Sequence, residues 1–156
     1  MAFIAGRYSA TYDGDSLGQT QDGIRLIHSV FKRLITGDAG GQTPQNAVYQ
    51  GMEAFVQYTL LEYDAAGAAA ALWPYGSGYL NASATIGSLD SSHAKPLVLT
   101  AVAGTPAANT PASITLPNVI LAEGFPVEIL FAPDLRTVPI RQRIYPDSSM
   151  KFGTLT

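Results

Sequence analysis

The sequence has no cysteine, only two histidines and one tryptophan. The absence of cysteine excludes a disulfide scaffold, a thiolate metal site and a cysteine nucleophile. His28 and His93 alone cannot build a metal site from several imidazoles. No apolar run reaches about 18 residues and the N-terminus has no secretory-signal pattern, so we expect synthesis in a cytoplasm and no membrane span.

Charged residues are also scarce. They make up 13% of the chain, against about 25% in a usual soluble domain, whereas 47% of the residues are apolar. Few charges on the outside are a solubility risk for a free monomer, which stable self-association would remove. The net charge of -3, with nine scattered basic residues, argues against a duplex-binding protein, which needs a concentrated footprint of Lys and Arg on the phosphates.

The pattern of the sequence predicts one β-rich domain over residues 1–156. Runs of β-branched and aromatic residues separated by turn signals predict strands at 5–12, 52–63, 97–103, 113–121, 126–132 and 137–145. Pro117 and Pro139 fall inside two of these runs, so those strands should lie at an edge or contain a bulge. An alanine-rich stretch at 65–72, capped by Asp64, predicts a short helix. The expected fold is mainly β, an antiparallel sandwich or barrel with one short flanking α-helix.

Three segments are less regular. Residues 24–35 carry apolar side chains near helical spacing, so periodicity alone narrowly favours a helix there. Residues 36–44 hold three glycines and a proline, which predict a mobile loop. Residues 74–96, rich in Gly, Ser, Ala and Pro, predict a long loop with a role in assembly.

The sequence offers little catalytic chemistry. His93, Asp90 and a serine could form a hydrolytic triad, but such residues occur together by chance in any chain, and a solvated loop histidine is the favoured interpretation. Asp13 and Asp15 flank Gly14, which favours a solvated turn over an acid/base pair. No phosphate-binding glycine motif is present. We therefore expect no enzyme activity, no cofactor and no metal.

Three aromatic residues, Trp73, Tyr75 and Tyr79, lie close together in the sequence. Grouped rings of this kind can form a platform for a ligand. Because Trp and Tyr are enriched at interfaces, the favoured interpretation is that they anchor a loop or fill a contact between subunits.

The order of several short pieces resembles the tail-tube subunits of bacteriophages, which are related in fold to the inner-tube proteins of type VI secretion. The pieces are Ser16–Leu26, Gly37–Gly40, Gln50–Met52, the long strand to Glu62 and the run Glu123–Asp134, which looks like that family's penultimate strand. The resemblance spans most of residues 5–145.

This resemblance implies a β-sandwich that neighbours close into a hexameric ring whose inner strands form a continuous barrel, with rings stacked into a tube that conducts DNA. It also implies that residues 24–35 form a strand, against the periodicity, since ring closure can bury both faces of a segment. The loop 37–48 would contact the adjacent ring and order on stacking. Its candidate residues are Gly37, Asp38, Gly40, Gly41 and Pro44.

By the same analogy, a conduit should not bind DNA tightly, so acidic or neutral side chains should face the lumen. Glu53 and Gln57, on one face of a strand, are the candidates. A lumen lined by Arg25, Lys32 and Arg33 would contradict this expectation. The implied partners are further copies of the chain, a tail sheath or tail terminator, and baseplate and tape-measure proteins, in a virion tail. A terminator, a tube initiator or another ring protein of the tail, neck or baseplate would share these features, as would a secretion-system inner tube. A ligand-binding β-sandwich and, behind it, an unrecognised hydrolase are the alternatives from other classes.

Overall fold

The structure, a computed structural model, describes residues 7–62, 66–76, 78–102, 111–130, 133 and 137–156. Within these ranges the fold is one antiparallel sheet of eight strands with one α-helix, as expected for a mainly β chain. The strands are β1 Tyr8–Tyr12, β2 Asp15–Ser16, β3 Thr20–Thr36, β4 Pro44–Leu60, β5 Lys95–Ala101, β6 Ser113–Leu121, β7 Val138–Ile144 and β8 Thr154–Leu155. The helix α1 is Ala66–Leu72, and two short 3-10 turns, η1 and η2, occupy Asp38–Gly40 and Asp90–Ser92.

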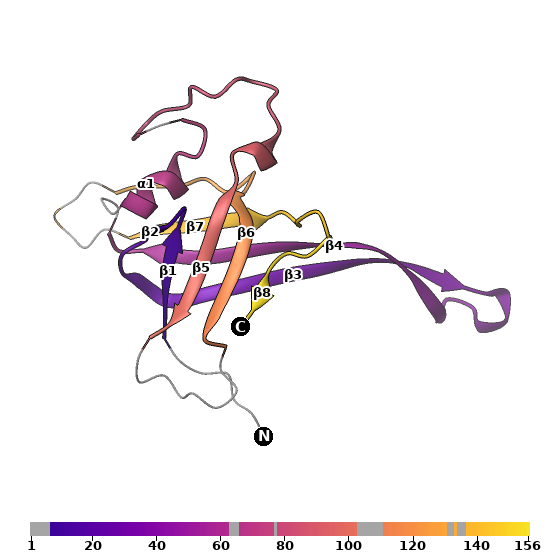
Figure 1. Cartoon of the computed structure of the whole chain (residues 1–156). Coiled ribbons are helices and arrows are strands. Elements are labelled where there is room, and N and C mark those ends of the chain that lie inside the picture. The colour runs from indigo at the N-terminus through magenta and orange to yellow at the C-terminus, as the bar shows by residue number, and fades with distance from the viewer. Residues whose placement is uncertain (1–6, 63–65, 77, 103–110, 131–132, 134–136) are drawn as a thin grey trace.

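The sheet folds over on itself. Its strand order is β2-β1-β5-β6-β7-β4-β3, with β8 paired to β6 off this path. β6 and β7 share only three residue pairs, from Val119–Ile144 to Leu121–Gln142, and the sheet changes direction there. The half made of β1, β5 and β6 therefore crosses in front of the half made of β7, β4 and β3 (Figure 1).

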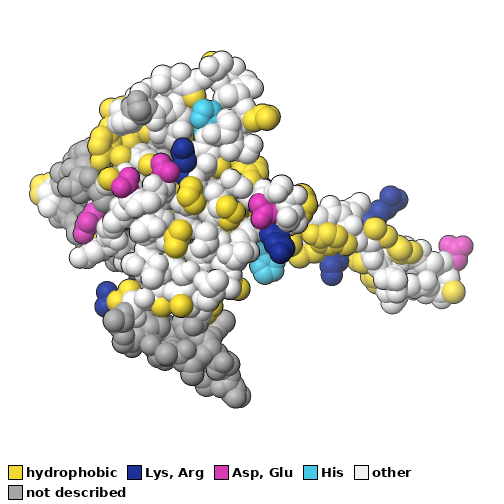
Figure 2. All heavy atoms as spheres, viewed as in Figure 1, with side chains coloured by type: hydrophobic (Ala, Val, Ile, Leu, Met, Phe, Trp, Pro, Cys, Tyr) yellow, Lys and Arg dark blue, Asp and Glu magenta, His cyan; other side chains and the backbone are white. Residues whose placement is uncertain are grey.

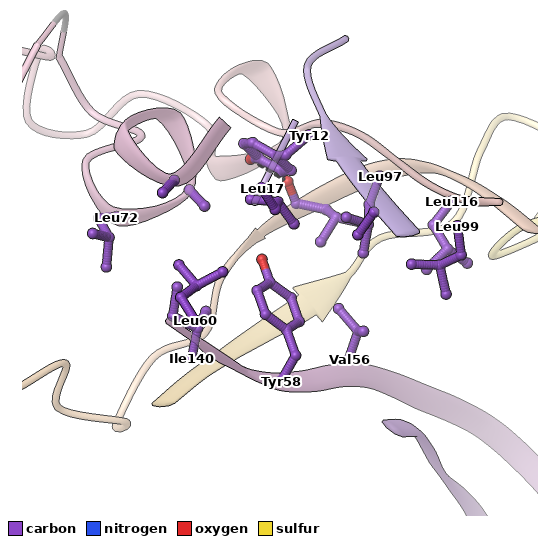
Figure 3. Packing of buried hydrophobic residues seen from close by; sticks show 14 of the residues in the cluster. Tyr12, Leu17, Val56, Tyr58, Leu60, Leu72, Leu97, Leu99, Leu116 and Ile140 are labelled. Carbon is purple, nitrogen blue, oxygen red and sulfur yellow. Dashed lines mark hydrogen bonds between the residues drawn. The ribbon is translucent and has the colours of Figure 1, made fainter. Parts of the chain in front are cut away.

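The core lies between these two halves. Tyr12 and Leu97 from β1 and β5 are fully buried, as are Val56 and Leu60 from β4. Figure 3 shows these side chains pointing toward one another, with Tyr58 between them. The fold is thus held by apolar contact across the two halves of one sheet, as in a sandwich.

Helix α1 covers the short edge of the sheet at β2. Gly67 lies so close to this edge that a Cβ atom there would be 2.6 Å from the carbonyl oxygens of Asp15 and Ser16. Ala68, Ala71 and Leu72 are buried against the core. The predicted helix is confirmed from residue 66, whereas its proposed cap, Asp64, lies outside the described residues.

The helix favoured by periodicity over residues 24–35 was wrong, and the strand implied by the resemblance is present as part of β3. The apolar residues there do not form one helical stripe facing the core; most are exposed on a strand. A pattern with apolar residues on both faces of a strand mimics helical spacing, which explains the error.

The strand expected at 126–132 was also wrong for residues 126–130, which have no strand partner among the described residues; 131–132 lie outside them. The bulge predicted for the strand with Pro117 is present, whereas β7, the strand with Pro139, is neither an edge strand nor bulged within the described structure. Pro117 lies where β6 bulges against β5, between the pairs Lys95–Val119 and Leu97–Leu116. Pro139 lies in the part of β7 that pairs with β4 alone.

The two expected loops are more regular than predicted. The connection between β3 and β4 spans only residues 37–43, because β4 already begins at Pro44. The connection after α1 contains η2 and ends at Lys95, where β5 begins.

Candidate self-assembly surface

A two-stranded ribbon projects from the body of the molecule. β3 and β4 pair along nearly their whole lengths, 17 residues each, but β7 pairs with β4 only from Ala54 to Leu60. Residues 29–36 and 44–53 therefore continue without a third strand, and we call them the ribbon (Figure 1). At about 3.3 Å per residue, residues 29–36 extend it by about 26 Å. A pair of strands without further packing is only marginally stable in water.

The ribbon exposes large apolar side chains on both faces. Alternation along β3 places Val30 and Leu34 on one face and Phe31 and Ile35 on the other. More than a third of the surface of each of seven large apolar side chains is exposed: Val30, Phe31, Leu34, Ile35, Val48, Tyr49 and Met52. Figure 2 shows hydrophobic side chains along the visible side of the ribbon. A strand pair in solution normally has one polar face, so both faces of this ribbon require cover.

The ribbon also carries the free edge of the sheet. At the opposite end of the strand order, β2 has only two residues and is covered by α1. β3 has 17 residues and pairs with β4 alone within the described structure. A long, uncovered edge strand is a template for pairing with another chain.

An ordered turn closes the tip of the ribbon. Gly40 N–H donates to the Gly37 carbonyl at 3.1 Å, and Thr43 N–H donates to the Gly40 carbonyl at 3.1 Å. The Gln45 side chain packs against Gly37, where a Cβ atom would lie 2.9 Å from its Nε2. Of the residues predicted to contact an adjacent ring, Gly37, Asp38, Gly40 and Gly41 lie in this turn and Pro44 begins β4. Their contact with another ring stays a prediction.

At the root of the ribbon lies an apolar hollow of about 200 Å³. Its lining includes Leu26 and Met52 from β3 and β4 and Leu116 and Phe152 from the body. The hollow lies where the ribbon meets the body of the molecule.

Glu53 and Gln57 share one face of β4, as predicted, with Phe55 between them. This face is opposite to the one that carries Val56 and Tyr58 into the core. Arg143 Nη1 donates to Glu53 at 3.3 Å, and the guanidinium groups of Arg141 and Arg143 lie 4.1 and 4.6 Å from the centre of the Phe55 ring.

The charge of this face differs from the acidic or neutral character expected for a lumen. Gln57 pairs in register with Arg25 on one side and Arg141 on the other. Arg143 also binds Glu123, and this hydrogen bond lowers the pKa of the Glu123 carboxyl. The face therefore presents three arginines beside Glu53, and its position in an assembly stays a prediction.

The three aromatic residues do not form one platform. Trp73 packs against the core and meets Tyr79 edge-on, with ring centres 5.1 Å apart. Tyr75 instead meets His93 edge-on at 5.4 Å and donates a hydrogen bond from its hydroxyl to Asp90. Trp73 thus fixes the start of the connection after α1 to the core, which is one of the predicted roles, whereas Tyr75 contacts residues of that same connection. A role between subunits stays a prediction.

The Asp90 carboxylate links two segments that are distant in sequence. Its second oxygen accepts a hydrogen bond from the Tyr145 hydroxyl at 2.6 Å, which ties η2 to the residue after β7. Burial and this hydrogen bond raise the pKa of Tyr145 to about 12. Burial and the bond to Asp90 likewise raise the pKa of Tyr75.

The structure does bring a serine to His93, since Ser88 Oγ lies 2.9 Å from His93 Nε2. The His93 backbone N–H donates to the Asp90 carbonyl at 3.0 Å, but in the described part of the chain no hydrogen bond joins the imidazole to the Asp90 carboxylate, whose oxygens are bound by two tyrosines. The third group that orients the imidazole in a catalytic triad is therefore engaged elsewhere. Asp13 lies in the turn between β1 and β2 and Asp15 begins β2; both are exposed, which agrees with the solvated turn expected there.

The described residues contain no group of three or more His, Cys, Asp or Glu side chains suited to a metal ion. None of the helices in the described ranges is long and apolar enough to cross a membrane. Comparison of the sequence with protein-family models and with curated proteins gave no match.

Proposed function

We propose that this chain is a structural subunit that assembles with copies of itself into rings, and that the rings stack into the tail tube of a bacteriophage. The observation that carries the proposal is the ribbon, with apolar side chains exposed on both faces and one free strand edge. The tail-tube identity and the hexameric ring rest on the sequence resemblance.

The ribbon gives self-association a driving force. Fully burying one large apolar side chain contributes about 1.5–3 kcal/mol, so a half-exposed one gains on the order of 1 kcal/mol. Seven such side chains lie on each ribbon. Their sum is comparable to the cost of association, about 4–15 kcal/mol, so each copy needs more than one contact surface. A ring provides this, because each copy then has two neighbours.

In this proposal the subunit works in a virion tail and is made in the host cytoplasm. DNA passes through the tube without sequence-specific binding. A tail sheath or terminator, baseplate proteins and a tape-measure protein are the further partners. No catalysis and no cofactor belong to this function.

Other ring proteins of the tail, neck or baseplate, including a terminator or a tube initiator, are the alternatives within this structural class. They would form a single closed ring, whereas a tube subunit forms a helical polymer. A ligand-binding module is less well supported, because Trp73, Tyr75 and Tyr79 already contact groups within the chain. A hydrolase is less well supported because Asp90 is bound by tyrosines.

The test is to express the chain alone and to examine it by size-exclusion chromatography and negative-stain electron microscopy. We expect hollow filaments or uniform rings. Filaments support the tube, and rings that never stack support a terminator or another ring protein. A monomer at every concentration and salt level would contradict self-assembly and direct attention to ligand screening by Trp73 fluorescence.

A further inference from the structure

Residues 125–130 have the pattern of a strand but no strand partner. Val127 and Ile129 pack against the core, whereas Pro126, Glu128 and Leu130 are exposed. This alternation is that of an extended chain seated on an apolar surface. Among the described residues, no hydrogen-bonded ladder joins the segment to β7 or to any other strand. Among the described residues, the segment is thus an extended backbone without a strand partner.

The free edge of the sheet is positively charged, whereas the segment 125–130 carries the negative charge of Glu128. β3 carries the exposed cations Arg25, Lys32 and Arg33, and neither ion pair found in the described residues involves them. Asp22 is the one acidic residue of β3. Glu128 is exposed and likewise takes no part in those two ion pairs.

We infer that residues 125–130 of one copy receive the free edge of β3 from the next copy, with Glu128 beside the cations of that strand. This inference rests on the proposed self-assembly and identifies the two surfaces that meet. Backbone hydrogen bonds between an added strand and an open edge supply affinity, and side chains set the register. Residues opposite each other on paired strands have Cβ atoms about 4.5–5.5 Å apart, close enough for an ion pair.

Two features favour this pairing over contact between two β3 edges. Two β3 strands would bring Arg25, Lys32 and Arg33 of one copy toward the same cations of the other, and like charges facing each other are destabilising. The pairing of β3 with residues 125–130 instead joins unlike surfaces. Such a head-to-tail contact generates a ring or a filament rather than a closed dimer.

The test uses charge reversal in two sets of variants. Glu128→Arg alone should raise the protein concentration needed for ring formation by about tenfold or more, because like charges would then face each other. Arg25→Glu, Lys32→Glu and Arg33→Glu, made separately, identify the partner: at least one should cause a similar loss. An equimolar mixture of Glu128→Arg with that variant should form rings, since each copy then finds an opposite charge on both neighbours.

Asp15→Arg is the matched control, because it makes the same charge change at an exposed residue of β2. It should form rings like the unaltered protein. A double variant that combines Glu128→Arg with one of the three β3 reversals also carries opposite charges on its two contact surfaces. The inference is wrong if Glu128→Arg forms rings normally, or if no mixture and no such double variant restores ring formation. Failure of the unaltered protein to assemble would instead contradict the proposed function, so the two failures are distinguishable.

Discussion

Tyr58 and Gln142 form a polar pair in the middle of the apolar core. The Tyr58 hydroxyl donates to Gln142 Oε1 at 2.7 Å, and both side chains are buried. Gln142 Nε2 has no hydrogen-bond partner among the described residues. The pair joins β4 to β7, the strands that connect the ribbon to the folded body.

Removing one partner of this pair should cost more than removing both. Tyr58→Phe leaves the buried Oε1 without a donor, which should lower the free energy of unfolding by about 1–3 kcal/mol. Tyr58→Phe with Gln142→Met replaces the pair by apolar groups and should cost less than Tyr58→Phe alone. Urea unfolding measures both variants. If the unaltered protein assembles, both are made together with Ile35→Glu, a substitution on the ribbon that should give a folded monomer. A double variant less stable than Tyr58→Phe would contradict this account of the pair.

The hydrogen bond between Tyr145 and Asp90 predicts that the stability of the fold depends on pH at high pH. Burial and the hydrogen bond to Asp90 raise the pKa of Tyr145 from its ordinary value near 10 to about 12. A raised pKa means that the folded state favours the neutral hydroxyl, so this contribution to stability is complete below pH 10 and is lost as the pH rises through about 12. Ultraviolet absorbance of tyrosinate should follow this titration.

Asp90→Asn should lower the pKa of Tyr145, because the amide carries no negative charge. Asp15→Asn, a change on the exposed β2 strand, is the control and should leave the titration unchanged. An unaltered titration in Asp90→Asn would show that burial alone sets the pKa of this group.

The sequence predicted most of the body of this fold because its strands alternate against a core. The predicted strand 113–121 coincides with β6, and 137–145 brackets β7. β3 was misread by periodicity because its apolar residues face both ways, and a single-chain core cannot explain such a pattern. Residues 126–130 kept the pattern of a strand but have no ladder with another strand among the described residues, since a ladder needs a second strand.

The candidate site was predictable only in part. Glu53 and Gln57 were correctly placed on one face because alternation along a strand is local. Their arginine neighbours come from β3 and β7, more than 25 residues away in sequence, so only the sheet register reveals them. The exposed ribbon was missed for the same reason, although a low charge content had already pointed to self-association.

Gly67 provides a test of how α1 packs on β2. Alanine is a better helix former than glycine by about 1 kcal/mol, but its Cβ would lie 2.6 Å from two backbone oxygens. Forcing atoms into a packed site costs about 1–3 kcal/mol, so Gly67→Ala should destabilise the fold in urea unfolding. Ala69→Gly, the control, should lose only the propensity difference. A more stable Gly67→Ala would show that the helix can move away from β2.

The tip of the ribbon is expected to act in stacking. Deleting residues 38–42 leaves Gly37 and Thr43 as a two-residue connection, and glycine in the first position suits a tight hairpin turn. The variant should therefore fold and form rings but not tubes. Circular dichroism checks the fold, and electron microscopy counts rings and tubes. Tubes of normal length would contradict a role for the tip in stacking.

The apolar faces of the ribbon allow a matched test of self-assembly. Ile35 lies on the ribbon with 46% of its surface exposed, and Met150 lies between β7 and β8 with 77% exposed. Ile35→Glu should abolish rings and leave a folded monomer, because a buried contact would have to accept an unpaired charge at a cost of several kcal/mol. Met150→Glu introduces the same charge at an exposed apolar residue outside the ribbon and should assemble normally. Equal loss in both variants would show that added charge alone prevents assembly, and normal assembly of Ile35→Glu would exclude this face of the ribbon from the contact between copies.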